Sequence, residues 1–136
     1  MTTPKLSAKR VLVVDDEPFV CDAVKMMLAF DGHEVETAGT PREALALFEP
    51  GKYDVVITDF QMPMMRGNEL AAAIRAKAPG QPIIMITAYA EMLQSSSELL
   101  ANIDHVISKP FLLEHLREGL QKVLSPRRST PDPKSS

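Results

Sequence analysis

Short apolar runs alternate along the chain with longer segments in which apolar residues recur at helical spacing. Three of these runs begin at Val11, Val55 and Ile83, and they are almost wholly apolar and rich in β-branched side chains. Strands of this kind are usually buried on both faces of a parallel sheet. Their alternation with helical segments predicts a parallel α/β fold with right-handed crossovers.

Five strand–helix units fill residues 9–124. The predicted strands cover 11–14, 34–38, 53–58, 82–87 and 105–108, and the predicted helices cover 18–30, 40–48, a segment after Gly67 ending at Pro79, 91–101 and 112–124. Thr40 is expected to cap the second helix and Glu43 to complete a capping box. In the fourth helix Met92, Leu99 and Leu100 are the expected inward positions, but the serines at 95–97 favour a short or mobile helix.

Residues with reactive or charged side chains stand at the carboxyl ends of four of the predicted strands. Asp15 and Asp16 follow the first strand, Asp59 the third, Thr87 closes the fourth, and Lys109 and Pro110 follow the fifth. In an open parallel sheet, ligands bind beyond the carboxyl ends of the strands. Three carboxylates, a hydroxyl group and an ammonium group are therefore expected at one edge of the sheet.

These side chains suit phosphoryl chemistry. Clustered carboxylates repel one another unless a cation is present, and oxygen ligands at a partly open site suit Mg²⁺. A carboxylate such as that of Asp59 can attack phosphorus and form an acyl phosphate. The metal ion and Lys109 would neutralise charge during the transfer. The pattern predicts a magnesium-dependent phosphoryl acceptor.

Four segments together resemble the receiver domain of two-component response regulators, the CheY-like group. They lie at 11–17, 59–67, 86–88 and 108–111 and read VLVVDDE, DFQMPMMRG, ITA and SKPF. The resemblance covers residues 9–124. It implies a doubly wound, five-stranded parallel sheet flanked by five helices, with the flavodoxin-like strand order 2-1-3-4-5.

The resemblance also implies a role for each acidic residue. Asp59 would be the phosphoacceptor. Asp16 would bind Mg²⁺ directly, Asp15 would assist through water, and the backbone carbonyl of Gln61 would be a further ligand. The family often has Met or Asn at the position of Gln61, which lies beside the attacking water, so the lifetime of the phosphoryl group is left open.

The remaining roles concern signalling. Lys109 would bridge to the phosphoryl oxygens, and its peptide bond to Pro110 would be cis. Thr87 would move to bind a phosphoryl oxygen, and Tyr89 would turn inward as an aromatic switch. The face built from the fourth helix, the fifth strand and the last helix would then bind a protein partner differently.

The implied partners are a histidine kinase or phosphotransfer protein as donor and an unknown downstream protein target. The chain would be a monomer or a weak phosphorylation-dependent dimer. It would be a signalling protein with at most weak self-phosphorylation and self-dephosphorylation, not an enzyme. The family's usual Gly before the fifth strand is missing, and Asn102, which tolerates a left-handed conformation, could replace it.

Other interpretations use the same residues. Asp15 and Asp16 could only cap the following helix, and Tyr89 could only pack on the surface. A phosphohydrolase of the haloacid-dehalogenase type would also use Asp59, but its second Asp would stand where this chain has Gln61. A degenerate adaptor would not need the intact set of acidic, hydroxyl and ammonium groups.

Composition and charge limit the partners, the cysteine chemistry and the cellular location that the sequence predicts. The 136 residues carry a net charge of -3 with mixed signs along the chain, which argues against direct nucleic-acid binding. Cys21 is the single cysteine, so no internal disulfide is expected. No apolar stretch approaches the roughly 20 residues that cross a bilayer, and a cytoplasmic location is expected. Residues 1–8 are interpreted as an N-terminal extension and 125–136 as a flexible Pro/Ser-rich tail.

Overall fold

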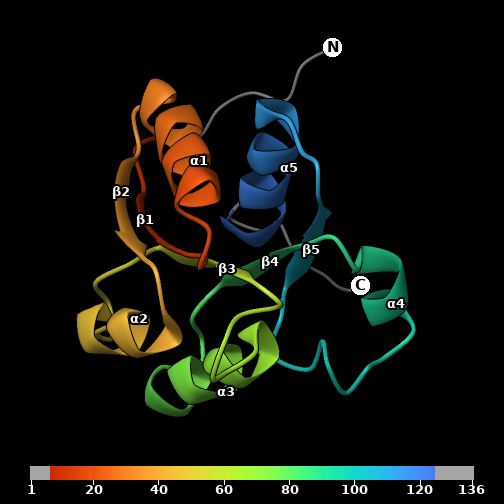
Figure 1. The fold of residues 1–136 in the computed structure, drawn as a ribbon. Helices are drawn as coiled ribbons and strands as arrows, with labels where there is room; N and C mark the ends of the chain where they lie inside the picture. The colour runs from red at the N-terminus through yellow and green to blue at the C-terminus, as the bar shows by residue number, and fades with distance from the viewer. Residues whose placement is uncertain (1–6, 125–136) are drawn as a thin grey trace, which may run out of the picture.

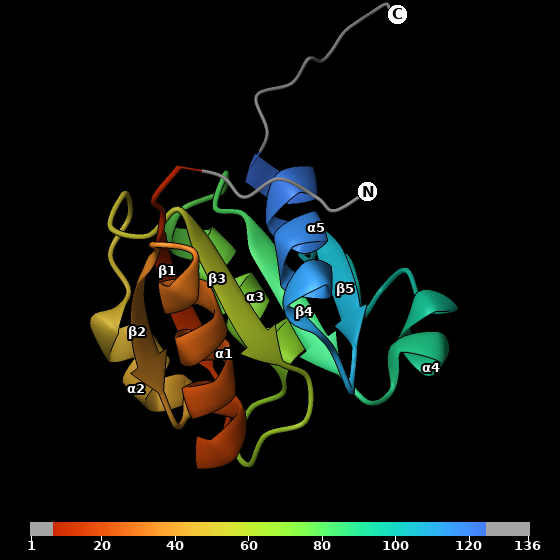
Figure 2. The ribbon, with the colours of Figure 1, turned by 90° about the horizontal axis from the view of Figure 1, so that it is seen from above.

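Five parallel strands form one sheet in the order β2-β1-β3-β4-β5 in the computed structural model, which describes residues 7–124. The strands are β1 (Arg10–Val14), β2 (Glu34–Ala38), β3 (Val55–Asp59), β4 (Ile83–Thr87) and β5 (His105–Ser108). The predicted fold and strand order are confirmed. Because every pairing is parallel, the carboxyl ends of the strands meet at one edge, as the strand arrows in Figure 2 show.

Helices cover both faces of the sheet (Figure 1). They are α1 (Pro18–Phe30), α2 (Pro41–Leu47), α3 (Gly67–Lys77), α4 (Ala90–Gln94) and α5 (Leu113–Leu124). Helices α1 and α5 lie on one face and α2 and α3 on the other, while α4 lies beside the β5 edge. The expectations for most of the N-terminal extension and for the tail fall outside the described residues.

The core is divided into two main layers by the alternation of strand side chains. Val11, Val13 and Ile57 pack under α1 and α5, whereas Leu12 and Val56 pack against α2 and α3. All five residues of β3 and of β4 are buried. The central strands therefore hold their carboxyl ends rigidly, which is the requirement for a site built there.

Helices α1 and α5 are joined by a charged pair on their shared face. Arg117 Nε lies 2.7 Å from Asp31 Oδ2, and Arg117 Nη2 lies 2.8 Å from Asp31 Oδ1. Two parallel charge-assisted hydrogen bonds fix the relative orientation of both groups. The Asp31 side chain is fully buried and the Arg117 side chain is 20% exposed, so the pair connects the end of α1 to the middle of α5 at the border of the core.

Local signals were correct for the Thr40 cap of α2 but not for its full capping box, and at α4 they were correct that the serines shorten the helix but not in its predicted extent. Thr40 Oγ1 accepts a hydrogen bond from the Glu43 backbone N–H at 3.0 Å, but the Glu43 carboxylate accepts from Gly39 and not from Thr40. The predicted helix over 91–101 ends at Gln94. Ser95 ends it with a side-chain hydroxyl that donates to the Met92 carbonyl at 2.9 Å, which is how serine competes with helix continuation.

The inward positions of the α4 region also differ from the prediction. Met92 is 51% exposed, whereas the neighbouring Leu93 is buried. The short helix turns the face that carries Leu93 toward Phe60 and Met85. Leu99 and Leu100 pack against this cluster as expected. Asn102 does not take a left-handed conformation, since Met64 is the one non-glycine residue with positive φ among residues 7–124. The turn before β5 is instead closed by Ile103 N–H donating to the Leu100 carbonyl.

No helix of the described part of the chain is both long and apolar enough to cross a membrane.

Candidate functional site

Three carboxylates meet where β1 and β3 end. Asp15 and Asp16 follow β1, and Asp59 is the last residue of the neighbouring strand β3. One carboxylate oxygen from each residue lies within 4.8 Å of the other two. Asp15 and Asp59 are buried and Asp16 is exposed, so the cluster opens to solvent on one side. The parallel register therefore brings Asp59 next to Asp15 and Asp16, which lie 44 and 43 positions before it in the sequence.

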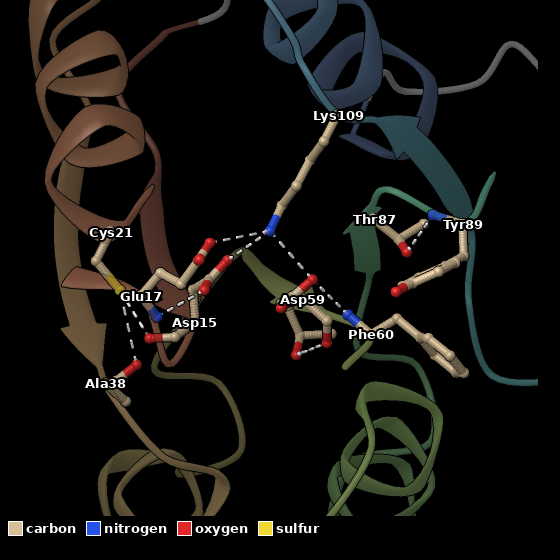
Figure 3. A network of polar contacts seen from close by, with 10 residues as sticks. Asp15, Glu17, Cys21, Ala38, Asp59, Phe60, Thr87, Tyr89 and Lys109 are labelled. Atoms are coloured by element: carbon tan, nitrogen blue, oxygen red, sulfur yellow. Dashed lines mark hydrogen bonds and ion pairs between the residues drawn. The ribbon is translucent and has the colours of Figure 1, made fainter. Parts of the chain in front are cut away.

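Lys109 reaches this cluster from the end of β5 (Figure 3). Its Nζ lies 3.3 Å from Asp15 Oδ2 and 3.3 Å from Asp59 Oδ1. The Lys109–Pro110 peptide bond is cis, the geometry that the family resemblance implies. One ammonium group is thus shared by two buried carboxylates.

The environment of the site disfavours the ionised forms of its two buried carboxylates. Burial and the neighbouring Asp15 raise the pKa of Asp59 to about 6, although Lys109 acts in the opposite direction. Burial also raises the pKa of Asp15. For Lys109, burial lowers the pKa, but the carboxylates of Asp59 and Asp15 outweigh it and the net shift is upward. A single lysine does not compensate the buried acidic pair.

The donor set fits a magnesium ion. Its members are hard carboxylate oxygens at a partly open site, which is the ligand type that Mg²⁺ prefers, together with the water molecules it keeps. Burial is the main cause of the raised pKa values of Asp15 and Asp59, and an added cation would act in the opposite direction by favouring the ionised carboxylates. Asp16, Asp59 and the carbonyl of Gln61 are the predicted ligands, with Asp15 assisting.

Thr87 and Tyr89 lie on the other side of Asp59, at the end of β4. Thr87 is fully buried, and its Oγ1 accepts a hydrogen bond from the Tyr89 backbone N–H at 2.9 Å (Figure 3). The Tyr89 side chain is 46% exposed. The hydroxyl oxygen of Thr87 is therefore held by the loop that follows β4.

A hollow of about 290 Å³ lies above Asp59. It is lined by Asp16, Glu17, Asp59, Gln61, Ala88, Tyr89 and Lys109. Gln61 is exposed at its border. Every residue predicted for the site lies in the hollow or in direct contact with a residue that lines it, except Pro110, which follows Lys109.

Two residues that contribute to the site were not given a role by the sequence. The Gly67 N–H donates to the Phe60 carbonyl at 2.7 Å, and a Cβ at Gly67 would lie 2.2 Å from the Asp59 carbonyl oxygen. Gly67 could have been found from the sequence because it is the last residue of the segment 59–67, which resembles the receiver family. Glu17 is the second, because its Oε1 lies 4.0 Å from Lys109 Nζ. Its position directly after the acidic pair was the available signal.

A five-stranded parallel sheet in the order β2-β1-β3-β4-β5, with acidic side chains, a threonine and a lysine at its carboxyl edge, defines a receiver-type fold. The sequence pattern of the response regulator receiver domain matches residues 11–121. The chain belongs to the response regulator receiver family.

Curated relatives agree with this assignment. Response regulator MprA of Mycolicibacterium vanbaalenii is 37% identical over 123 residues, which cover 90% of this chain and 52% of that protein. Transcriptional regulatory protein TrcR of Mycobacterium tuberculosis is 36% identical over 121 residues, covering 89% of this chain and 46% of that protein. The chain spans about half the length of the curated relatives it matches.

Solved structures with the same fold include two with strong sequence similarity. Response regulator TrrA of Thermotoga maritima, in complex with Mg²⁺-BeF, superposes with a TM-score of 0.77 at 39% identity, covering 85% of this chain and 99% of that one. Chemotaxis response regulator CheY4 of Vibrio cholerae superposes with a TM-score of 0.78 at 36% identity, covering 87% of this chain and 100% of that one.

The burial of the Asp59 carboxyl predicts that the free energy of unfolding of the metal-free protein depends on pH. The folded carboxyl has a pKa of about 6 and the unfolded one a value near 3.8, so its contribution to stability is fully present below the unfolded value and is lost as the pH rises through 6. At neutral pH we therefore expect Asp59→Asn to be more stable than the wild type by about 1–3 kcal/mol. The difference should shrink as the pH falls towards about 4.5.

Denaturant unfolding in EDTA, at several pH values, measures this difference. His105 acts in the opposite direction, because burial lowers its pKa and acid therefore destabilises the folded state, but it contributes equally to both proteins and cancels. Added Mg²⁺ should stabilise the wild type more than the variant. Parallel stability curves for the two proteins from neutral to acid pH would contradict the prediction.

Proposed function

We propose that this receiver domain accepts a phosphoryl group on Asp59 from a phosphohistidine of a histidine kinase or phosphotransfer protein, with Mg²⁺ as cofactor. The observation that carries the proposal is the convergence of Asp15, Asp16 and Asp59 within 4.8 Å, with Lys109 at 3.3 Å from Asp59. The Mg²⁺-BeF complex of TrrA supports it, since that related protein binds these groups.

The chain's own residues would divide the chemistry as follows. An Asp59 carboxylate oxygen forms a bond to phosphorus as the bond from phosphorus to the donor's nitrogen breaks, and the donor keeps that electron pair. Lys109 stays beside the Asp59 carboxylate and neutralises one negative charge of the transferred group. Mg²⁺, held by Asp16, Asp59 and the Gln61 carbonyl, would neutralise further charge at the phosphoryl oxygens.

The proposed output is a population shift in the loop after β4. The phosphoryl oxygens would accept a hydrogen bond from Thr87, which would give up its present contact with the Tyr89 N–H. Tyr89, half exposed here, would turn inward, and the face made of α4, β5 and α5 would change its affinity for a protein partner. The short α4 and its packing on Phe60, directly after Asp59, support coupling between this face and the site.

The wider setting is also proposed. We infer a cytoplasmic protein that is a monomer or a weak phosphorylation-dependent dimer, with at most slow phosphorylation and dephosphorylation of its own. Residues 7–124 are proposed to act through protein contacts and not on nucleic acid directly. Relatives such as TrcR are named transcriptional regulators and are about twice as long, so a longer protein could carry such an output.

Incubation with acetyl phosphate and Mg²⁺, read by intact mass, tests the proposal. The wild type should gain one phosphoryl group, and Asp59→Ala or the addition of EDTA should prevent the gain. Asp22→Ala, which removes an exposed aspartate of α1, is the matched control and should be phosphorylated normally. A wild type without the gain, or an Asp59→Ala protein that gains as much, would refute the assignment.

Two alternatives give different results in the same assays. A phosphohydrolase would turn over a phosphomonoester continuously, but the position two residues after Asp59 is Gln61, whose amide cannot act as the general acid. An inert adaptor would show no response to beryllofluoride with Mg²⁺. The receiver should respond through tyrosine fluorescence, since the chain has 2 tyrosines and no tryptophan.

A further inference from the structure

Glu17 stands at the mouth of the site, where its carboxylate lies 4.0 Å from Lys109 Nζ and takes no part in capping α1. It is the N-cap residue of α1, yet its side chain makes no capping hydrogen bond. Its backbone N–H donates to Asp15 Oδ1 at 2.9 Å, a bond that any side chain at this position would keep. The Glu17 side chain is 66% exposed and lines the hollow above Asp59.

The carboxylate of Glu17 is close to the reacting group. Its Oε1 lies 4.0 Å from Lys109 Nζ, which is 3.3 Å from Asp59 Oδ1, so Glu17 lies within about 7 Å of the Asp59 oxygen. When a divalent cation is bound, the charges of the three aspartates are balanced by the ion and Lys109. The charge of Glu17 then remains uncompensated at the entrance.

We propose that Glu17 is a specificity-determining residue that disfavours small anionic phosphodonors at this site. The inference rests on the proposed function and adds a selection among donors. A free donor such as acetyl phosphate carries two negative charges past Glu17, and repulsion at this distance is only partly screened by solvent. A protein donor can place a positive side chain opposite Glu17, which a small anion cannot do.

Two small donors of different charge separate this effect from general reactivity. With acetyl phosphate, a dianion, Asp59 gains the phosphorus–oxygen bond and acetate leaves with the electron pair of the broken bond. With phosphoramidate, a monoanion, the phosphorus–nitrogen bond breaks and protonated nitrogen leaves as ammonia. We expect Glu17→Gln to accelerate the acetyl phosphate reaction about 3- to 10-fold, and the phosphoramidate reaction by about the square root of that factor.

Varying the salt concentration and the charge at position 17 tests whether the effect of Glu17 is electrostatic. The acceleration should fall towards one at about 0.5 M salt, where the Debye length is only about 4 Å. Glu17→Lys should accelerate the acetyl phosphate reaction further. Glu34→Gln is the matched control, because it removes one exposed carboxylate at the amino end of β2, the opposite edge of the sheet, and should change neither rate. All rates are measured at saturating Mg²⁺, established separately for each variant.

The results discriminate between the two proposals. Equal acceleration with both donors, no acceleration, or an equal effect of Glu34→Gln would overturn the role of Glu17 while Asp59 phosphorylation in the wild type left the proposed function intact. Failure of the wild type to be phosphorylated by either donor would overturn both. A larger acceleration with the dianionic donor than with the monoanionic donor, lost at high salt, would establish that the charge of Glu17 selects among donors.

Discussion

Replacing Lys109 with methionine is expected to slow phosphorylation of Asp59 by about 100-fold or more, the cost typical of removing one charged group that stabilises a transition state. Among residues 7–124, Lys109 is the basic residue that forms ion pairs with Asp15 and Asp59, and its side chain is only 19% exposed. Methionine keeps much of the length and the apolar stem but removes the charge. The initial rate with acetyl phosphate at saturating Mg²⁺ measures the effect.

The same variant should bind Mg²⁺ more tightly than the wild type. The ammonium group of Lys109 competes with a metal ion for the same two carboxylates, both of which it approaches to 3.3 Å. A lower phosphorylation rate together with a higher Mg²⁺ affinity would indicate the loss of a charge that acts in the transfer. A collapsed site would lose both the rate and the affinity. Lys25→Met, which removes an exposed lysine on α1, is the control. A Lys109→Met protein with a wild-type rate would show that its charge takes no part in the transfer.

Replacing Gly67 with alanine is expected to destabilise the protein by about 3 kcal/mol, at the upper end of the range for overpacking. A Cβ at this position would lie 2.2 Å from the Asp59 carbonyl oxygen and 3.0 Å from Phe60 Cα. These are backbone atoms of the end of β3, so no side chain can rotate away to relieve the contact. The strand end or the start of α3 must move.

Because the atoms displaced belong to Asp59, the proposed phosphoacceptor, the alanine variant should also lose phosphorylation rate and Mg²⁺ affinity. Gly80→Ala is the matched control, since a Cβ there would meet nothing within 4 Å and its φ is ordinary. Its free energy of unfolding should stay within about 0.5 kcal/mol of the wild type. Urea unfolding of both variants, followed by the phosphorylation assay, tests the prediction. Wild-type stability of Gly67→Ala would show that the loop adapts freely.

The sequence alone predicted most of the architecture, because the responsible signals are local. The buried runs at β1, β3 and β4 have the composition of central parallel strands, and the start of α2 has its capping threonine. Parallel alternation then places the strand-end residues Asp15, Asp59 and Lys109 at one edge. The serines that follow Gln94 favour the short α4 that the structure shows, but local signals failed where tertiary packing decided the outcome, since Leu93 instead of Met92 faces the cluster around Phe60.

What the sequence determined by itself is which chemical groups follow which strand, since residue order and strand composition fix both. What only the tertiary structure decided is how closely those groups approach. Whether Lys109 touches one carboxylate or two, how deeply Asp59 is buried, and whether Gly67 tolerates a side chain all depend on distances across neighbouring elements. The raised pKa of Asp59 follows from desolvation by that packing, which residue order does not specify.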